Sequence, residues 1–197
     1  MTSSVFNKEQ QRLMKRREIV RVAGRLFCKQ GFQATSLNDI AGEMGMTKTV
    51  IYYYFRNKEE IFILCHRQAI DAMEAAMNAA RNDDPIIQIR DFIRIYVCEL
   101  IGVNNPGAVL LDDYLLPREE GDEIRARKNK VQQALEDLIV EGKARGLIGE
   151  CDTKAAIMAL MSAINILPRW FNEKGKLSPE TLAESYSHVF TYGLAAR

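Results

Sequence analysis

The chain has 197 residues, of which 47% are hydrophobic and 27% charged, with 12 glycines and 5 prolines. This composition is that of an ordinary globular chain of one or two domains, and it excludes a disordered, collagen-like or disulfide-rich protein. The formal net charge of +1 is unevenly distributed, because residues 1–58 carry about +7 and the remainder about −6. A basic segment joined to an acidic one indicates that a polyanion binds the first segment, although a solvated charged face is the plainer interpretation.

The cysteines are widely separated and have neither CxxC nor metal-ligand spacing; they are Cys28, Cys65, Cys98 and Cys151. We therefore expect buried thiols in a reducing compartment, no metal site and no cofactor. The first residues are polar and charged, and no apolar run is long enough to cross a bilayer. These features predict a cytoplasmic protein with no membrane partner.

Helical periodicity begins after a polar stretch, residues 1–8, which we expect to be frayed. An apolar stripe then predicts a helix that ends at Gly31; its members are Ile19, Val20, Ala23, Leu26 and Phe27. The cations on this helix either reach phosphates flanking a DNA site or simply confer solubility; they are Lys15, Arg16, Arg17 and Arg21.

Two short helices separated by a glycine follow. The first has apolar residues from Leu37 to Met44 at helical spacing, and Ser36 with Asp39 forms a capping-box pattern at its start. Gly45 ends it, and the hydroxyl of Thr47 is predicted to cap a second helix over residues 48–55. Three side chains of this second helix are expected to face inward, namely Val50, Ile51 and Phe55.

The outward face of the second helix is unusual because it carries a lysine and three adjacent tyrosines. Exposed aromatic rings are unfavourable in water, but each phenol hydroxyl can donate to a phosphate. Two short helices joined by a glycine turn, the second rich in donors, predict a helix-turn-helix whose second helix enters the DNA major groove.

At these residues the chain resembles the TetR family of bacterial transcriptional regulators. The resemblance covers residues 17–61 without a gap and rests on the following pairs and runs: Gly31-Phe32, Thr35-Ser36, Ile40-Ala41, Gly45-Met46-Thr47, Ile51-Tyr52-Tyr53-Tyr54-Phe55 and Asn57-Lys58-Glu59. It implies a DNA-binding domain over residues 1–58 and a ligand-binding and dimerisation domain over residues 59–197.

DNA contacts are predicted on both short helices. Base edges are assigned to Asn38, Lys48 and Thr49, since a lysine pairs well with guanine O6 and N7. Phosphate contacts, which fix register without reading sequence, are assigned to Thr35, Ser36, Thr47, Tyr52, Tyr53, Tyr54 and Lys58. For Tyr54, a place in the domain core is an equal alternative.

The remaining sequence contains only helical patterns. A long helix over residues 58–80 is capped by Asn57 and Glu60, and Pro85 starts a helix that runs to a loop at residues 104–107. Later helices are predicted from Pro117 to Arg145, from Thr153 to Asn172 with a kink at Pro168, and from Pro179 onward. We therefore expect an all-α fold of about nine helices.

The helix after Asp152 is apolar over too much of its circumference for a single core face. Small residues such as Ala155 and Ala159 accompany Leu160 and Met161, which indicates burial on two sides. The family resemblance implies that the last two helices form a homodimer, whose two-fold symmetry predicts an operator with an inverted repeat.

A pocket for a small-molecule effector is expected between the helix over residues 58–80 and the helices from residue 84 to residue 172. Its candidate residues are His66, Phe92, Tyr96, Asp112, Asn165, Arg169 and Trp170, with Leu110 and Leu111 among further apolar lining. The segment NILPRWFNEKGKLSPETLAESY is similar to TetR members that sense acyl-CoA thioesters. Arg169 suits a phosphate and Trp170 an adenine ring, while surface solvation and core packing are the alternatives for the two side chains.

Other classes of protein fit the sequence less well. An enzyme needs convergent acid, base or nucleophilic groups, and His66 and His188 are isolated. A helical adaptor without a DNA role does not explain a lysine beside three exposed tyrosines. We expect a non-enzymatic repressor that releases a palindromic operator when an acyl-CoA binds, with a multidrug or lipophile sensor controlling an efflux pump as the alternative.

Overall fold

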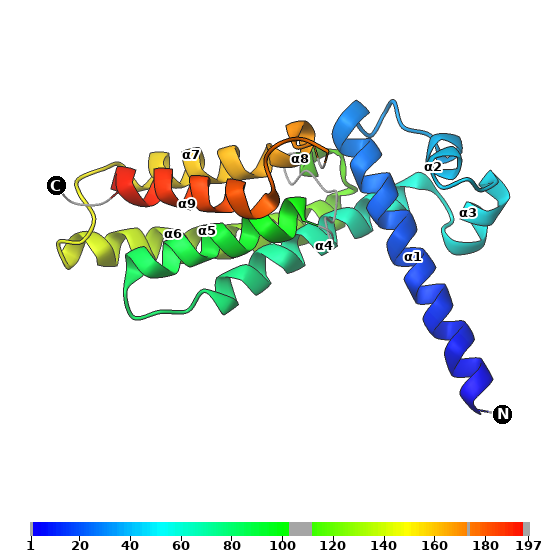
Figure 1. Ribbon diagram of the computed structural model, residues 1–197, viewed down its shortest axis with the longest axis horizontal. Helices are drawn as coiled ribbons and strands as arrows, with labels where there is room; N and C mark the ends of the chain where they lie inside the picture. The colour runs from blue at the N-terminus through cyan, green and yellow to red at the C-terminus, as the bar shows by residue number, and fades with distance from the viewer. Residues whose placement is uncertain (1, 103–111, 173, 195–197) are drawn as a thin grey trace.

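A computed structural model of the protein describes residues 2–102, 112–172 and 174–194. Within these residues the fold is all-α and contains no strand, which confirms the predicted class (Figure 1). The elements are α1 (Thr2–Gln30), α2 (Leu37–Glu43), α3 (Lys48–Tyr54), α4 (Lys58–Ala79), α5 (Pro85–Ile101), the 3-10 helix η1 (Asp113–Leu115), α6 (Arg118–Ala144), α7 (Thr153–Asn165), α8 (Leu167–Trp170) and α9 (Pro179–Leu194). The loop predicted at residues 104–107, Leu110 and Leu111 lie outside the described residues.

The helices form an elongated bundle with a smaller unit at one end (Figure 1). In the bundle, α5 packs against α4, α6 and α9, while α1, α2 and α3 make up the smaller unit. The long helix α4 enters the bundle from this unit, and it buries Ile61 near its start and Met73 near its end completely. The two units therefore share one continuous hydrophobic core through α4, and the domain boundary at residue 58 stays a prediction.

The predicted helix caps are formed in full at α2, in part at α4 and not at α3. The Ser36 hydroxyl accepts from the Asp39 N–H while the Asp39 carboxylate accepts from the Ser36 N–H, which confirms the capping box of α2. The Asn57 side chain accepts from the Glu60 N–H at α4, but the Glu60 carboxylate accepts from Arg56 instead of Asn57. Thr47 precedes α3 without a side-chain cap, so that predicted hydrogen bond was wrong.

Three other local predictions differ from the structure. Residues 2–8 were expected to fray but are helical, because α1 begins at Thr2. The helix predicted over residues 153–172 is interrupted near its end as expected, but at Ile166, where it divides into α7 and α8. Pro168 has no N–H with which to continue the hydrogen bonding of α7. Val50 is 38% exposed, although it was predicted to face inward with Ile51.

The thiols are only partly buried as a group. Cys28 and Cys65 lie in the core, and burial raises the pKa of the Cys28 thiol to about 12. Cys98 and Cys151 are half-buried. Across the described part of the chain, no helix has the length and apolarity needed to span a membrane, and no group of acidic, histidine or cysteine side chains is arranged to hold a metal ion.

Candidate nucleic-acid interface

Helix α3 has one face in the core and one face in water. Ile51 is fully buried and Phe55, just after the helix, is 2% exposed, so these two side chains fix α3 against the unit. Lys48 and Thr49 are exposed, as is most of the face that follows. The outward face is therefore a compact polar surface on a helix whose opposite face is packed in the core through Ile51 and Phe55.

The tyrosines on α3 differ in exposure. Tyr52 is 51% and Tyr53 is 71% exposed, whereas Tyr54 is half-buried and packs against the core. The Lys48 amine lies 5.5 Å from the centroid of the Tyr52 ring, and the Tyr53 ring meets the Tyr54 ring edge-on at 5.0 Å. Two phenol hydroxyls are thus presented to solvent beside a cation, where they can donate to an anionic partner.

The side chain of Lys58, which is predicted to contact a phosphate, makes hydrogen bonds within the protein. Its Nζ donates to the carbonyl oxygens of Phe32 at 2.7 Å and Thr35 at 2.8 Å, and it lies 4.2 Å from the centroid of the Phe32 ring. Two of the three donors of this ammonium group are therefore used inside the protein. Lys58 anchors the turn between α1 and α2 to the start of α4.

Arg16 fastens α1 to the far side of the same unit. Its guanidinium donates to the Tyr54 carbonyl oxygen and, at 3.2 Å, to the Glu60 carboxylate, and it lies 4.3 Å from the centroid of the Phe55 ring. This single side chain links α1 to the end of α3 and the start of α4. The sequence signalled Arg16 only as one of several cations on α1.

The other predicted DNA contacts divide between structural and exposed residues. Thr35 is 1% exposed and its hydroxyl donates to the Gly31 carbonyl oxygen, which places it inside the turn. Ser36 is exposed but its hydroxyl is engaged with Asp39, whose pKa is lowered by the hydrogen bonds from Ser36. Asn38 and Thr47 are exposed on the side of the unit that leads to α3.

The predicted effector residues fall into two separate groups, of which the first lies in the core. His66, Phe92 and Tyr96 are fully buried, and Asn165 is 5% exposed. The Tyr96 hydroxyl donates to the Asn165 side-chain oxygen at 2.9 Å, and burial raises the pKa of Tyr96. These residues connect α4, α5 and α7 across the centre of the bundle.

The second group lies where α8 meets α1. The Nη2 atom of Arg169 donates to both carboxylate oxygens of Asp112 at 3.0 Å, and Trp170 beside it is 49% exposed. A cleft of about 610 Å³ adjoins them. Its charged lining comprises Arg25, Lys29, Arg169, Lys174 and Glu43. The excess of cations and the exposed indole make this a suitable site for an anionic, aromatic ligand.

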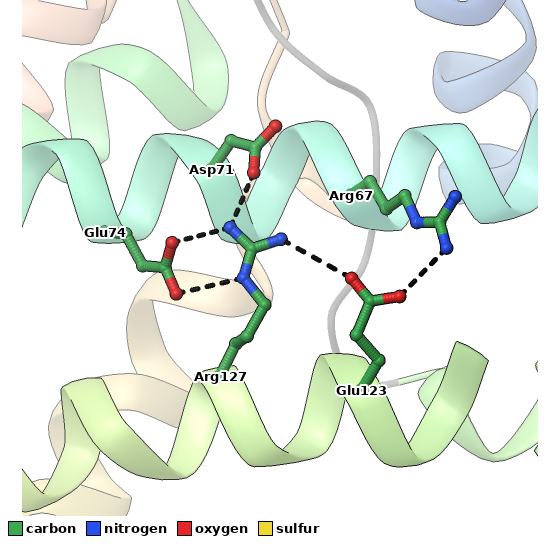
Figure 2. Close-up of polar contacts among 5 residues, drawn as sticks. All are labelled: Arg67, Asp71, Glu74, Glu123 and Arg127. Atoms are coloured by element: carbon green, nitrogen blue, oxygen red, sulfur yellow. Dashed lines mark hydrogen bonds and ion pairs between the residues drawn. The ribbon is translucent and has the colours of Figure 1, made fainter. Parts of the chain in front are cut away.

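An ion-pair network joins α4 to α6 in the bundle (Figure 2). The Arg127 guanidinium donates to Glu74 through Nε at 3.0 Å and to Asp71 through Nη2 at 2.6 Å, and Glu123 pairs with Arg67 at 2.9 Å. Hydrogen bonds from Arg127 lower the pKa of the Glu74 carboxyl. The network holds the middle of α4 against α6, and no short motif in the sequence signals the contacts between the two helices, because those partners lie more than fifty positions apart.

Comparison with known families accounts for most of the chain. Residues 19–65 match the family described as bacterial regulatory proteins, tetR family, and residues 82–194 match the tetracyclin repressor-like C-terminal domain. The second match alone covers more than half of the chain. The chain belongs to the TetR family. Its helix-turn-helix unit and helical C-terminal domain are those of this family of bacterial regulatory proteins.

Curated TetR-family relatives are similar mainly over the first part of the chain. The HTH-type transcriptional regulator RutR of Escherichia coli (strain K12) is 37% identical over 82 residues, which are 41% of this chain and 39% of that protein. The regulator AcrR of Shigella flexneri is 34% identical over 87 residues, 43% of this chain and 40% of AcrR. The chain thus matches about two fifths of the length of these relatives.

Solved TetR-family structures resemble the whole fold. PfmR from Thermus thermophilus is 28% identical with a TM-score of 0.73, covering 88% of this chain and 97% of PfmR. AibR in complex with isovaleryl coenzyme A and operator DNA is 25% identical with a TM-score of 0.72, covering 88% of this chain and 96% of AibR. KstR2 of Mycobacterium tuberculosis is 20% identical with a TM-score of 0.80, covering 93% of this chain and 96% of KstR2, and shows the fold alone.

Proposed function

We propose that this TetR-family protein is a homodimeric cytoplasmic repressor that binds a palindromic operator and is released by an acyl-CoA thioester. The observation that carries the operator part is the outward face of α3, where Lys48, Tyr52 and Tyr53 stand exposed on a helix fixed by Ile51. A donor-rich helix held in this way fits the second helix of a helix-turn-helix in the major groove.

The contacts to DNA divide by the chemistry of the side chains. Lys48 and Thr49, at the start of α3, reach base edges together with Asn38 on α2, and the Lys48 amine donates to guanine. Tyr52 and Tyr53 donate to phosphates and set the register of the helix. Lys58 and Thr35 act indirectly, because they hold the α1–α2 turn that positions α2.

The dimer is supported by two exposed stripes, one on α7 and one on α9. On α7 the exposed residues at helical spacing are Ala155, Met158, Ala159 and Ser162, and on α9 they are Ser185, His188, Val189 and Tyr192. Both stripes include a large apolar side chain that is exposed to water, since Met158 is 51% and Val189 is 64% exposed. Helices α7 and α9 lie along the same side of the bundle (Figure 1), so one partner can cover both stripes about a two-fold axis.

The effector proposal rests on the cleft between α1 and α8. Arg169 and Trp170 line it together with Arg25, Lys29 and Lys174. The cations can bind the phosphates of CoA, and the indole can stack on its adenine ring. The structural relative AibR was solved with isovaleryl coenzyme A and operator DNA, which supports a CoA ligand for a chain of this fold. The acyl group would extend toward the buried group around Tyr96.

The route from effector to DNA is helix α4. It starts at the end of the helix-turn-helix, passes Cys65 and His66 in the core, and is clamped to α6 by Arg127 (Figure 2). A ligand that binds one position of α4 more tightly shifts the population toward that position, and the two α3 helices of the dimer then lose operator spacing. A switch from 1:99 to 99:1 needs a differential affinity of about 5.5 kcal/mol.

A mobility-shift titration tests this proposal. The operator is first selected from a pool of randomised duplexes, and an inverted repeat is expected. Isovaleryl-CoA, free CoA and free isovalerate are then added separately, and only the thioester should lower operator affinity strongly. Release by lipophilic compounds without CoA would favour a sensor that controls an efflux pump, and selection of no preferred inverted repeat would contradict the operator proposal.

A further inference from the structure

Helix α1 extends well beyond the unit that it helps to build. Arg16 is the side chain that fastens α1 to α3 and α4, yet the helix begins at Thr2. The fourteen residues from Thr2 to Lys15 correspond to about 20 Å at 1.5 Å per residue. Figure 1 shows this part, which we call the α1 arm, projecting away from the body of the molecule.

A cationic groove lies between the α1 arm and the end of α3. It is lined by Lys8, Gln11, Arg12, Lys15, Tyr53 and Tyr54. The four arm residues follow the spacing i, i+3, i+4, i+7, so they form one stripe along the helix. A stripe at this spacing is apolar when it packs into a core, whereas this one carries three cations and an amide.

The cations of this stripe are weakly neutralised within the protein. Lys15 pairs with Glu18 at 2.8 Å on the surface, an arrangement that contributes little in water. Lys8 and Arg12 form no ion pair within the described part of the chain, and Arg12 is exposed. The phenol ring of Tyr53, which is 71% exposed, closes the other side of the groove. The groove therefore offers positive charge and hydroxyl donors to a polyanion.

The direction of the arm places it outside the centre of an operator. In Figure 1 the α7 and α9 face lies on one side of the molecule, and the start of α1 projects toward the opposite side. If the partner subunit covers α7 and α9, each arm points away from the two-fold axis. A duplex that passes across α3 then continues beneath the arm, and ~20 Å of arm spans about six base pairs at 3.4 Å each.

We propose that the α1 arm is a second DNA-binding surface, which uses Lys8, Arg12 and Tyr53 to hold the phosphate backbone flanking each half-site. This inference rests on the proposed operator binding by α3 and adds a separate, sequence-independent contact to it. The arm supplies affinity and lengthens the footprint, because phosphate contacts carry no base information. Two phosphates per arm correspond to roughly three to four units of salt dependence for a dimer.

The test compares two duplexes and two charge variants. One duplex ends at the outer edge of the selected inverted repeat, and the other carries ten further base pairs of arbitrary sequence on each side. The double variant Lys8→Gln/Arg12→Gln removes two cations, and Arg81→Gln/Lys130→Gln removes two exposed cations from the C-terminal domain as a matched control. Glutamine is a good helix former, so circular dichroism should show α1 intact.

Wild-type protein and the control should bind the flanked duplex at least tenfold more tightly than the trimmed one, with a steeper salt dependence. The arm variant should bind both duplexes alike, with the trimmed duplex unaffected, and hydroxyl-radical footprints should lose protection only in the flanks. Equal affinity of wild type for both duplexes would overturn the arm proposal while operator binding stands. Failure of every form to bind the trimmed duplex would contradict the function of α3 itself.

Discussion

The DNA-facing surface of α3 and the cleft between α1 and α8 are built in opposite ways. The α3 surface comes from one run of seven residues, and its exposed Lys48 and Tyr52 depend on the buried Ile51 in the same helix. The cleft gathers Arg25 from α1 and Arg169 from α8, which are far apart in the sequence. A surface made by one helix depends on local periodicity, whereas a cleft depends on how distant helices pack.

The largest expected effect separates the two regions directly. The double variant Lys48→Ala/Tyr52→Ala should bind the selected operator at least 100-fold more weakly. The base contact of Lys48 is worth about 1–3 kcal/mol and the dimer loses it twice, together with the two phosphate contacts of Tyr52. Its binding of isovaleryl-CoA, measured by calorimetry, should remain unchanged. Lys130→Ala serves as a control with the same loss of charge far from α3. Retained operator binding in the double variant would move DNA recognition away from this helix.

The reciprocal change is in the cleft. Arg169→Gln should leave operator affinity unchanged but raise the isovaleryl-CoA concentration needed for release by roughly 10-fold to 100-fold, since a charged hydrogen bond is worth about 1.5–3 kcal/mol. Arg145→Gln is the matched control, because Arg145 also pairs with a carboxylate, Glu141, at 3.0 Å on the surface. An unchanged titration would show that the cleft does not hold the ligand.

A substitution of Lys58 tests whether this cation contacts a DNA phosphate or instead holds the α1–α2 turn in place. Lys58→Met should lower the melting temperature by about 4–8 °C, because two carbonyl oxygens lose a charged donor worth about 2 kcal/mol. Operator affinity should fall, but its slope against salt concentration should stay the same. A slope that falls by about one unit per subunit, with normal thermal stability, would instead assign Lys58 to a phosphate.

The smallest expected effect concerns the entry to α2. Hydrogen bonds from Ser36 lower the pKa of Asp39, so their stabilisation is present above the unfolded pKa and is lost as the pH falls through the folded value. Ser36→Ala should therefore lower the melting temperature by a few degrees at pH 7 and by less near pH 3. Thermal scans at both pH values measure this. An equal loss at both would indicate that the carboxylate plays no part.

The sequence predicted the fold and the entry to the DNA-binding unit well. The capping box of Ser36 and Asp39, the helix start at Pro85 and the helix end at Gly45, where φ is 63°, are local features, each decided by residues within a few positions. The contacts of the Lys58 side chain were harder to predict, because the carbonyl oxygen of Phe32 that it binds lies in a turn 26 residues earlier. Periodicity alone does not contain that contact.

The effector site was predicted less well for the same reason. Apolar helical spacing located Phe92 and Tyr96 in the bundle, where they are fully buried. The sequence motif around Arg169 was recognised. The pairing of Arg169 with Asp112 and its position against α1 arise from the division of the helix into α7 and α8 at Ile166. Helix packing of this kind joins segments that no short window of sequence brings together.

Helix α1 has a mechanical consequence that joins the two regions. It is one uninterrupted rod that carries Lys8 at one end, the Arg16 attachment near its middle and Arg25 in the cleft wall at the other end. Between these two points the rod is held in the core by Ile19, Val20, Val22 and Ala23, and it packs against α4. A load applied to the cleft end would therefore be carried along a stiff body that includes the start of α4, so occupancy of the cleft and the position of the opposite end would change together.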